Sequence, residues 1–140
     1  MDSDILKRVD VLVKKAYYTS ERFRLSVTFA LLYHEESLNI VELSKYIRIT
    51  DQAISLDDNH YFIIFAYTSH ENSYKASQNT VHSLDKYFNN FTTCIALDTF
   101  DTSKSSQIVL SRLHQILAET KKSSYIRTET EDILDDKRKL

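Results

Sequence analysis

The chain has 140 residues, which suits one domain with one hydrophobic core, and its hydrophobic fraction of 42% and charged fraction of 27% are ordinary for a folded protein. Its net charge of -2, with both signs spread along the chain, argues against a nucleic-acid partner. The single cysteine, Cys94, excludes an internal disulfide, and no apolar stretch is long enough to cross a bilayer. We therefore expect a cytoplasmic protein with a buried thiol and no membrane partner.

The chain contains neither glycine nor proline. Without glycine it cannot form a phosphate-binding loop or a dinucleotide-binding turn of the usual kind. Its turns must instead use Asn, Asp and Ser, which tolerate the left-handed backbone region better than most residues. The candidate turns are residues 57–59, 89–90 and 101–103.

The first half of the chain begins with an amphipathic helix, which we expect over residues 4–18 with Ser3 as its N-cap. Residues 25–33 are apolar at nearly every position, which predicts a central strand buried on both faces. A short helix over residues 38–48, capped by Ser37, is expected to follow.

The second half begins with a hairpin, in which the two strands flank a turn at residues 57–60. Ser69 is the expected cap of the long helix that follows. The predicted elements are strands at 52–56 and 61–67, a helix at 70–88, a strand at 91–100, a helix at 106–120 and an edge strand at 124–128.

Without the first and last helices, this order is β-α-β-β-α-β, the ferredoxin-like arrangement. We therefore predict an α/β (α+β) fold in which an antiparallel sheet carries its helices on one face. We expect a single domain over residues 1–128, with an N-terminal helix in residues 1–20 and a charged tail at 129–140.

Three stretches of sequence carry a resemblance to a known family: Arg24 to His34, Arg48 to Ile64, and Thr93 to Ser123. In their order and spacing they resemble the GGDEF domain, the palm-like domain of diguanylate cyclases. The resemblance runs from about residue 5 to residue 124. It implies the palm-like fold and a role in signalling by cyclic di-GMP.

The five signature positions of that family hold Asp57, Asp58, Asn59, His60 and Tyr61 in this chain. In the family, paired glycines let the substrate nucleotide lie against the backbone, and two aspartates replace them here. Their side chains and charges would oppose a triphosphate. The signature acid is replaced by the neutral Asn59.

The metal-binding aspartate of the family's first strand falls at Leu31, which is apolar. Two-metal phosphoryl transfer needs carboxylates that hold Mg²⁺ against the phosphates. We therefore predict that the chain is not an active cyclase, has no catalytic residues, and holds no metal or cofactor.

Arg48 and Asp51 are separated by five residues from the signature, which is the spacing of the family's inhibitory site for cyclic di-GMP. A guanidinium suits phosphate and guanine acceptors, and a carboxylate suits guanine N–H donors. Lys45, one helical turn before Arg48, would add a second cation. The alternative is that Arg48 and Asp51 pair with each other and only stabilise the turn.

His34, Glu35 and Glu36 follow the first strand, and with the two hairpin aspartates they could imitate a metal site. A solvated charged loop is the simpler interpretation. The nine tyrosines and seven phenylalanines lie mostly on inward stripes, so core packing explains them better than stacking on nucleic acid.

Three functions stay open at this point. The first is a non-catalytic GGDEF-like signalling module that acts through protein contacts, with the N-terminal helix as the interface for a partner protein or a homodimer. The second is a cyclic di-GMP receptor that uses Arg48 and Asp51. The third is an enzyme of unknown type.

Overall fold

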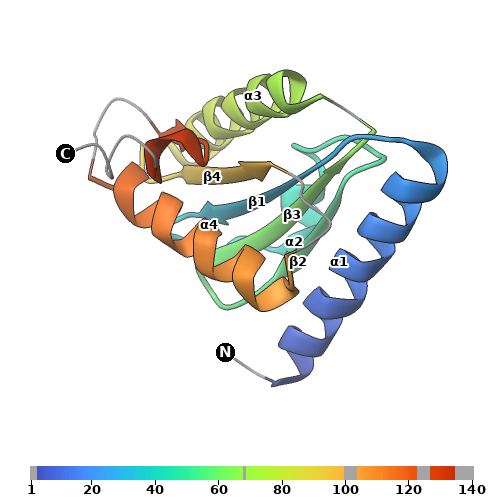
Figure 1. The fold of residues 1–140 in the computed structure, drawn as a ribbon. Helices are drawn as coiled ribbons and strands as arrows, with labels where there is room; N and C mark the ends of the chain where they lie inside the picture. The colour runs from blue at the N-terminus through green and yellow to red at the C-terminus, as the bar shows by residue number, and fades with distance from the viewer. Residues whose placement is uncertain (1–2, 68, 100–103, 123–126, 135–140) are drawn as a thin grey trace.

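The structure is a computed structural model, and it describes residues 3–67, 69–99, 104–122 and 127–134. A five-stranded sheet lies between helices (Figure 1). No helix within the described ranges is long and apolar enough to cross a membrane. In chain order the elements are α1 (Ser3–Phe23), β1 (Val27–Tyr33), α2 (Ile40–Ser44), β2 (Gln52–Ser55), β3 (His60–Ala66), α3 (His70–Phe88), β4 (Cys94–Thr99), α4 (Ser106–Thr120) and β5 (Thr128–Glu129).

The strand order in the sheet is β2-β3-β1-β4-β5. The first four strands are antiparallel neighbours in the ferredoxin-like order, which confirms the predicted fold class. The fifth strand pairs with β4 in parallel. Tyr33, at the end of β1, lies opposite His60 on one side and Cys94 on the other. The β2–β3 turn and the loops that flank β1 and β4 therefore meet at one end of the sheet.

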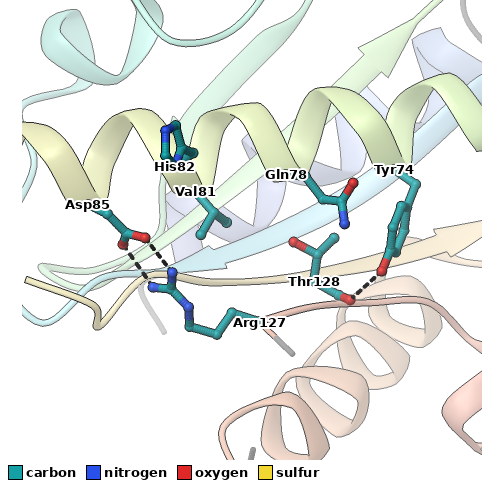
Figure 2. Close-up of a pocket in the computed structure, with 7 residues that line it drawn as sticks. All are labelled: Tyr74, Gln78, Val81, His82, Asp85, Arg127 and Thr128. Carbon is teal, nitrogen blue, oxygen red and sulfur yellow. Dashed lines mark hydrogen bonds and ion pairs between the residues drawn. The ribbon is translucent and has the colours of Figure 1, made fainter. Parts of the chain in front are cut away.

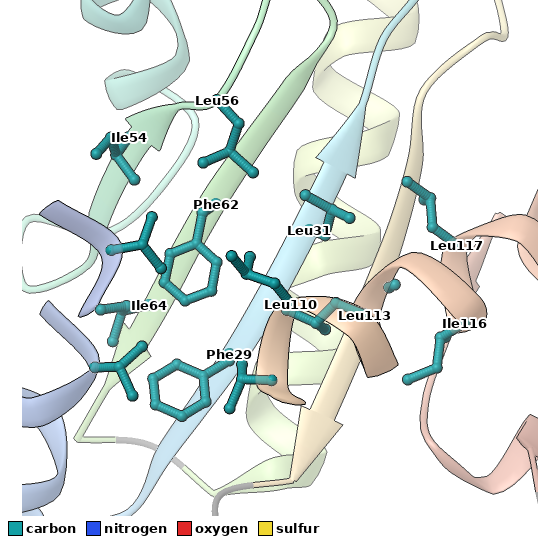
Figure 3. Close-up of a cluster of buried hydrophobic side chains, with 14 of the residues drawn as sticks. Phe29, Leu31, Ile54, Leu56, Phe62, Ile64, Leu110, Leu113, Ile116 and Leu117 are labelled. Atoms are coloured by element: carbon teal, nitrogen blue, oxygen red, sulfur yellow. The ribbon is translucent and has the colours of Figure 1, made fainter. Parts of the chain in front are cut away.

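Helices cover both faces of the sheet, which corrects the prediction that they lie on one face. Helices α1 and α4 pack on the face that carries Phe29 and Leu31 (Figure 3), and α2 and α3 pack on the face that carries Ala30 and Leu32. The prediction was based on the β-α-β-β-α-β segment alone, and its two helices, α2 and α3, do share one face. Because β1 is apolar on both sides, as the sequence indicated, the first and last helices complete a second core.

The helix ends show where local sequence decides the structure. The bounds of α3 and α4 are the predicted ones, and the Ser69 hydroxyl accepts a hydrogen bond of 3.1 Å from the backbone N–H of Asn72. Helix α2 is shorter than the predicted 38–48. Its N-cap is Asn39, not Ser37, because the Asn39 side-chain oxygen accepts a bond of 2.8 Å from the backbone N–H of Val41.

Three described residues that are not glycine have a positive φ: Arg24, Tyr67 and Asn89. Asn89 ends α3 with a φ of 53°, in a turn that the sequence predicted. Arg24 and Tyr67, with φ of 53° and 57°, were not predicted. They lie at the same end of the sheet because Val27 of β1 pairs with Ala66 of β3. This conformation is unfavourable for side chains with a Cβ, so the surrounding structure must enforce it.

The last described segment, residues 127–134, packs on the domain. Within the predicted edge strand 124–128, residues 124–126 lie outside the described residues, and β5 begins at Thr128. Ile133 and Leu134, from the segment predicted as a charged tail, pack against the cluster between the sheet and α1 and α4. The boundary between domain and tail stays a prediction.

Candidate functional site

The signature hairpin turn joins β2 to β3 and is held by its own side chains. The Asp57 carboxylate accepts hydrogen bonds of 2.8 Å from the backbone N–H groups of Asn59 and His60, and it lies 2.9 Å from Nδ1 of His60. Burial raises the pKa of Asp57, but the bonds from Asn59 and His60 outweigh it and hold that pKa below its usual value. Asp57 therefore closes a turn that contains no glycine.

Asn59 ties this turn to the loop that follows β1. Its amide group donates hydrogen bonds of 3.1 Å and 2.7 Å to the backbone carbonyls of His34 and Glu35. The backbone carbonyl of Asn59 accepts a hydrogen bond of 3.0 Å from the backbone N–H of His34. Asn59 thus fills a structural role that an ionised carboxylate, which cannot donate a hydrogen bond, could not fill.

Tyr61 fastens the same loop from the core. Its side chain is fully buried, and its hydroxyl accepts a bond of 2.6 Å from the backbone N–H of Leu38. The hydroxyl also lies 2.9 Å from the carbonyl of Leu38 and 3.2 Å from that of Asp58, so it can donate to either. The loop, the turn and β3 therefore form one hydrogen-bonded unit.

His34 is buried, which corrects its interpretation as part of a solvated loop. Its Nδ1 lies 2.6 Å from the Thr93 hydroxyl, and its ring lies 4.5 Å from that of Phe88. Burial lowers the pKa of His34, which favours the neutral ring. Glu35 and Glu36 are exposed, as expected. No group of three His, Cys, Asp or Glu side chains in the described part of the chain is placed to hold a metal ion.

Leu31 lies in the middle of β1 and not beside the hairpin turn. It pairs with Phe62 and Ala96, and its side chain points into the core (Figure 3). Leu31 is therefore a core residue in this fold, and its alignment with the family's metal aspartate stays a prediction. The residues after β1 that contact the turn are His34 and Glu35.

Arg48 and Asp51 form a closed pair. The guanidinium donates from Nη2 to Oδ1 at 2.6 Å and from Nε to Oδ2 at 3.0 Å. The same Nη2 donates to the carbonyl of Ala66 at 2.7 Å, while the backbone N–H groups of Arg48 and Ala66 donate to the carboxylate at 3.0 Å and 3.3 Å. The Asp51 side chain is fully buried, and that of Arg48 is 40% exposed. This geometry matches the alternative in which Arg48 and Asp51 pair with each other and stabilise the turn.

Lys45 does not share a helix face with Arg48, because α2 ends at Ser44. Its Nζ lies 2.9 Å from a carboxylate oxygen of Glu42, and the hydrogen bond to Glu42 raises the pKa of Lys45. The structure therefore pairs Lys45 with Glu42 and does not bring it to the Arg48–Asp51 pair.

A polar pocket of about 300 Å³ between α3 and β5 was not predicted. Figure 2 shows Asp85, from α3, pointing toward Arg127, which precedes β5. Their side chains make two hydrogen bonds, and the Tyr74 hydroxyl donates to the carbonyl of Thr128 at 3.2 Å. Asp85 follows Val81 by four residues and so lies on the inner side of α3. A buried carboxylate there indicates that a cation must pair with it, which is the signal in the sequence for this contact.

A second cavity, of about 490 Å³, opens beside the end of β1. Its walls include Tyr33, Phe91 and Cys94, and its cations are Lys121 and Arg127. The Lys121 Nζ lies 3.7 Å from the centre of the Tyr33 ring. Burial raises the pKa of Cys94 and so favours the thiol, and the prediction that this residue is buried is confirmed.

No family model and no curated protein match the chain in sequence. Similar solved structures include the GGDEF domain of DgcB from Caulobacter crescentus in complex with c-di-GMP, with a TM-score of 0.71 and 11% identity over 90% of each chain. The GGDEF domain of FimX from Pseudomonas aeruginosa matches with a TM-score of 0.64 and 14% identity, over 85% of this chain and 88% of that one.

A further similar structure is diguanylate cyclase SiaD from Pseudomonas aeruginosa, in complex with its activator SiaC. The TM-score is 0.67 and the identity 9%, and the match covers 88% of this chain and 56% of SiaD. The chain therefore has a GGDEF-like fold, and that prediction is confirmed.

Proposed function

We propose that this chain is a non-catalytic GGDEF-like signalling module that acts through protein contacts. The observation that carries the proposal is that the polar side chains of the signature hairpin already have hydrogen-bond partners within the fold. The Asp57 carboxylate is committed to the turn, and the Asn59 amide is committed to the carbonyls of His34 and Glu35. A metal or a triphosphate would have to displace these bonds, and the residues offer no replacement for them.

The chemistry of the neighbouring residues also supports the absence of catalysis. Two-metal phosphoryl transfer needs carboxylates that point at one place. The buried side chain at the end of β1 is the imidazole of His34, whose pKa is lowered by burial. The position of the signature acid holds the amide of Asn59. Contact with another protein requires no such chemistry. The complex of SiaD with its activator SiaC is a case of a structurally similar protein that assembles with a protein partner.

The test is a cyclase reaction with GTP and either Mg²⁺ or Mn²⁺, analysed by chromatography for cyclic di-GMP. We expect no product above a reaction without protein. Product that disappears in an Asp57→Ala, Asn59→Ala double variant would overturn the proposal. The double variant separates activity of this hairpin from activity of a contaminating cyclase, which the substitutions would not change.

The second candidate is a cyclic di-GMP receptor that uses Arg48 and Asp51. The solved structure of the DgcB domain with c-di-GMP favours it by analogy. Against it stands the closed geometry of the pair, since both carboxylate oxygens and the Nε and Nη2 atoms of Arg48 are already hydrogen-bonded. Binding would have to replace a bidentate ion pair around a fully buried carboxylate, so we favour protein contact.

A further inference from the structure

An apolar pocket of about 100 Å³ lies between α1 and the end of the sheet formed by β2 and β3. Its apolar lining comes from Leu12 and Ala16 of α1, Val27 and Ile64 of the sheet, and Tyr67, and its polar lining includes two threonines and a glutamine. An engineered apolar cavity of about 150 Å³ binds benzene, so this pocket has room for an aliphatic side chain. It lies on the side of α1 away from α4, because Tyr17, on the other side, bonds to Lys104 just before α4.

The border of this pocket on α1 is basic. Residues seven apart lie on the same edge of a helix, because seven residues make about two turns. Arg8, Lys15 and Arg22 have this spacing, and all three are exposed. Lys15 lines the pocket, and Arg8 and Arg22 lie about two helical turns before and after it on the same edge of α1. None of the lining residues is acidic.

Exposed apolar surface continues from the pocket along the same helix. Phe23 follows Ala16 by seven residues and is 60% exposed, and Tyr67 at the opposite rim is 54% exposed. Tyr67 also has a positive φ of 57°, a conformation that the Arg48–Asp51 pair supports by fixing the preceding Ala66. Lys15 and Tyr67 therefore line the pocket itself, and Arg8, Arg22 and Phe23 lie further along α1.

The charges decide which occupant fits. Helix α1 carries five basic and three acidic residues, whereas the whole chain has a net charge of -2. A second copy that docked through the same edge would place Arg8, Lys15 and Arg22 near their own counterparts, and like charges across an interface cost several kcal/mol. A segment that carries carboxylates around an apolar side chain would match both the border and the pocket.

We propose that this pocket binds an acidic amphipathic helix of a partner protein. One aliphatic side chain of the partner enters between Ala16 and Ile64, and its carboxylates contact Arg8, Lys15 and Arg22. The proposal rests on the proposed function as a contact module and names the surface and the partner chemistry. It also assigns the predicted interface on the N-terminal helix to a partner protein, not to a homodimer.

The test uses a synthetic peptide in which pairs of Glu alternate with pairs of Leu over about four helical turns. A second peptide has Lys in place of Glu, and a third has Ala in place of Leu. Each is titrated into the full, isotope-labelled chain while the backbone amide signals are recorded. We expect the Glu/Leu peptide to shift the signals of Leu12, Ala16 and Ile64, and the other two peptides to bind at least about tenfold more weakly.

Two variants localise the binding. Lys15→Glu should weaken the Glu/Leu peptide at least about tenfold. Lys75→Glu, an exposed cation on α3, is the matched control and should leave binding unchanged. An unchanged amide spectrum elsewhere shows that each variant is folded. No binding of the Glu/Leu peptide, equal binding of all three peptides, or no effect of Lys15→Glu would overturn the proposal.

Vesicles of phosphatidylcholine and phosphatidylserine form a further arm, because a basic helix edge with aromatic residues can also meet an anionic lipid surface. Sedimentation of the chain with these vesicles, without peptide binding, would overturn the proposal and assign the surface to a membrane. These outcomes are separate from the cyclase test. If the Glu/Leu peptide does not bind, only the assignment of this pocket is wrong. If the chain forms cyclic di-GMP from GTP, the proposed function is wrong.

Discussion

Replacing Asp51 with alanine tests whether the Arg48–Asp51 pair holds the structure together. The Asp51 side chain is fully buried, and its carboxylate accepts hydrogen bonds from the Arg48 guanidinium and from the backbone N–H groups of Arg48 and Ala66. The substitution removes all of these acceptors at once. The guanidinium, which is 40% exposed, can turn to water, but the backbone groups stay in place.

The expected cost follows from the groups left without partners. Each backbone N–H that loses its acceptor away from water costs about 1–3 kcal/mol, and two are affected. The partly exposed ion pair adds about 1 kcal/mol or less, because its cation is rehydrated. Since the turn can relax and admit some water, we expect the free energy of unfolding to fall by about 2–4 kcal/mol.

The assay is urea unfolding followed by circular dichroism, with Glu71→Ala as the matched control. Glu71 is an exposed acid whose carboxylate lies 3.6 Å from Nζ of Lys75, and its loss should change the free energy of unfolding by no more than about 0.5 kcal/mol. If Asp51→Ala is as mild as the control, the pair does not hold the turn. Its side chains would then be available to a ligand.

Three further substitutions test other parts of the site. Arg127→Met leaves the buried carboxylate of Asp85 unpaired, so we expect urea unfolding to show a loss of about 3 kcal/mol. Asn59→Asp removes the donors to two backbone carbonyls and should cost about 1–3 kcal/mol in the same assay. Because burial lowers the pKa of His34, the unfolded state binds a proton that the folded state resists, so stability should fall as pH drops through 6.5. In His34→Gln, thermal unfolding followed from about pH 7 to about pH 5 should show a shallower decline.

Each of these variants has a control on the surface. Lys122→Met breaks an exposed ion pair with Glu119, and Asp58→Asn changes an exposed position of the hairpin, so both should stay within about 1 kcal/mol of the unchanged chain. His82→Gln, at an exposed position of α3, should keep the pH dependence. Losses as large in the controls, or an unaltered pH profile in His34→Gln, would contradict the roles assigned to the buried groups.

Local patterns predicted the elements of the fold where side-chain periodicity is strong. Helix α4 has its predicted bounds because Val109, Leu113, Ile116 and Leu117 form one apolar stripe, and all four are buried. Strand β1 was predicted to be buried on both faces for a similar reason. Helix α2 was overextended because Lys45 and the residues after it continue a helical pattern while the backbone already turns at Ser44.

The layer arrangement required information that no local pattern carries. The sequence showed that the first and last helices are amphipathic, but their apolar stripes do not say which face of the sheet they cover. The parallel pairing of β5 with β4 was likewise hidden, since only two residues of β5 take part. The Asp85–Arg127 pair depends on that pairing, because it joins residues 42 apart in sequence.

The sequence indicated where the residues of the candidate site lie, but it did not indicate what each of them does. The hairpin and the Arg48–Asp51 spacing were visible, and both interpretations of the pair were open. The contact with Ala66, 18 residues away from Arg48, shows how the pair is used in the fold. His34 was misjudged because two glutamates follow it, whereas its burial depends on Phe88 and Thr93, far along the chain.

The most direct test of the account is calorimetric titration of the purified chain with cyclic di-GMP and with GTP in the presence of Mg²⁺, beside the Arg48→Ala variant. The account predicts no saturable heat for either nucleotide at high micromolar concentration. The Asp57 and Asn59 side chains are committed to the fold, and Arg48 is committed to Asp51. Saturable heat with cyclic di-GMP that disappears in Arg48→Ala would contradict it, and would make the chain a nucleotide receptor.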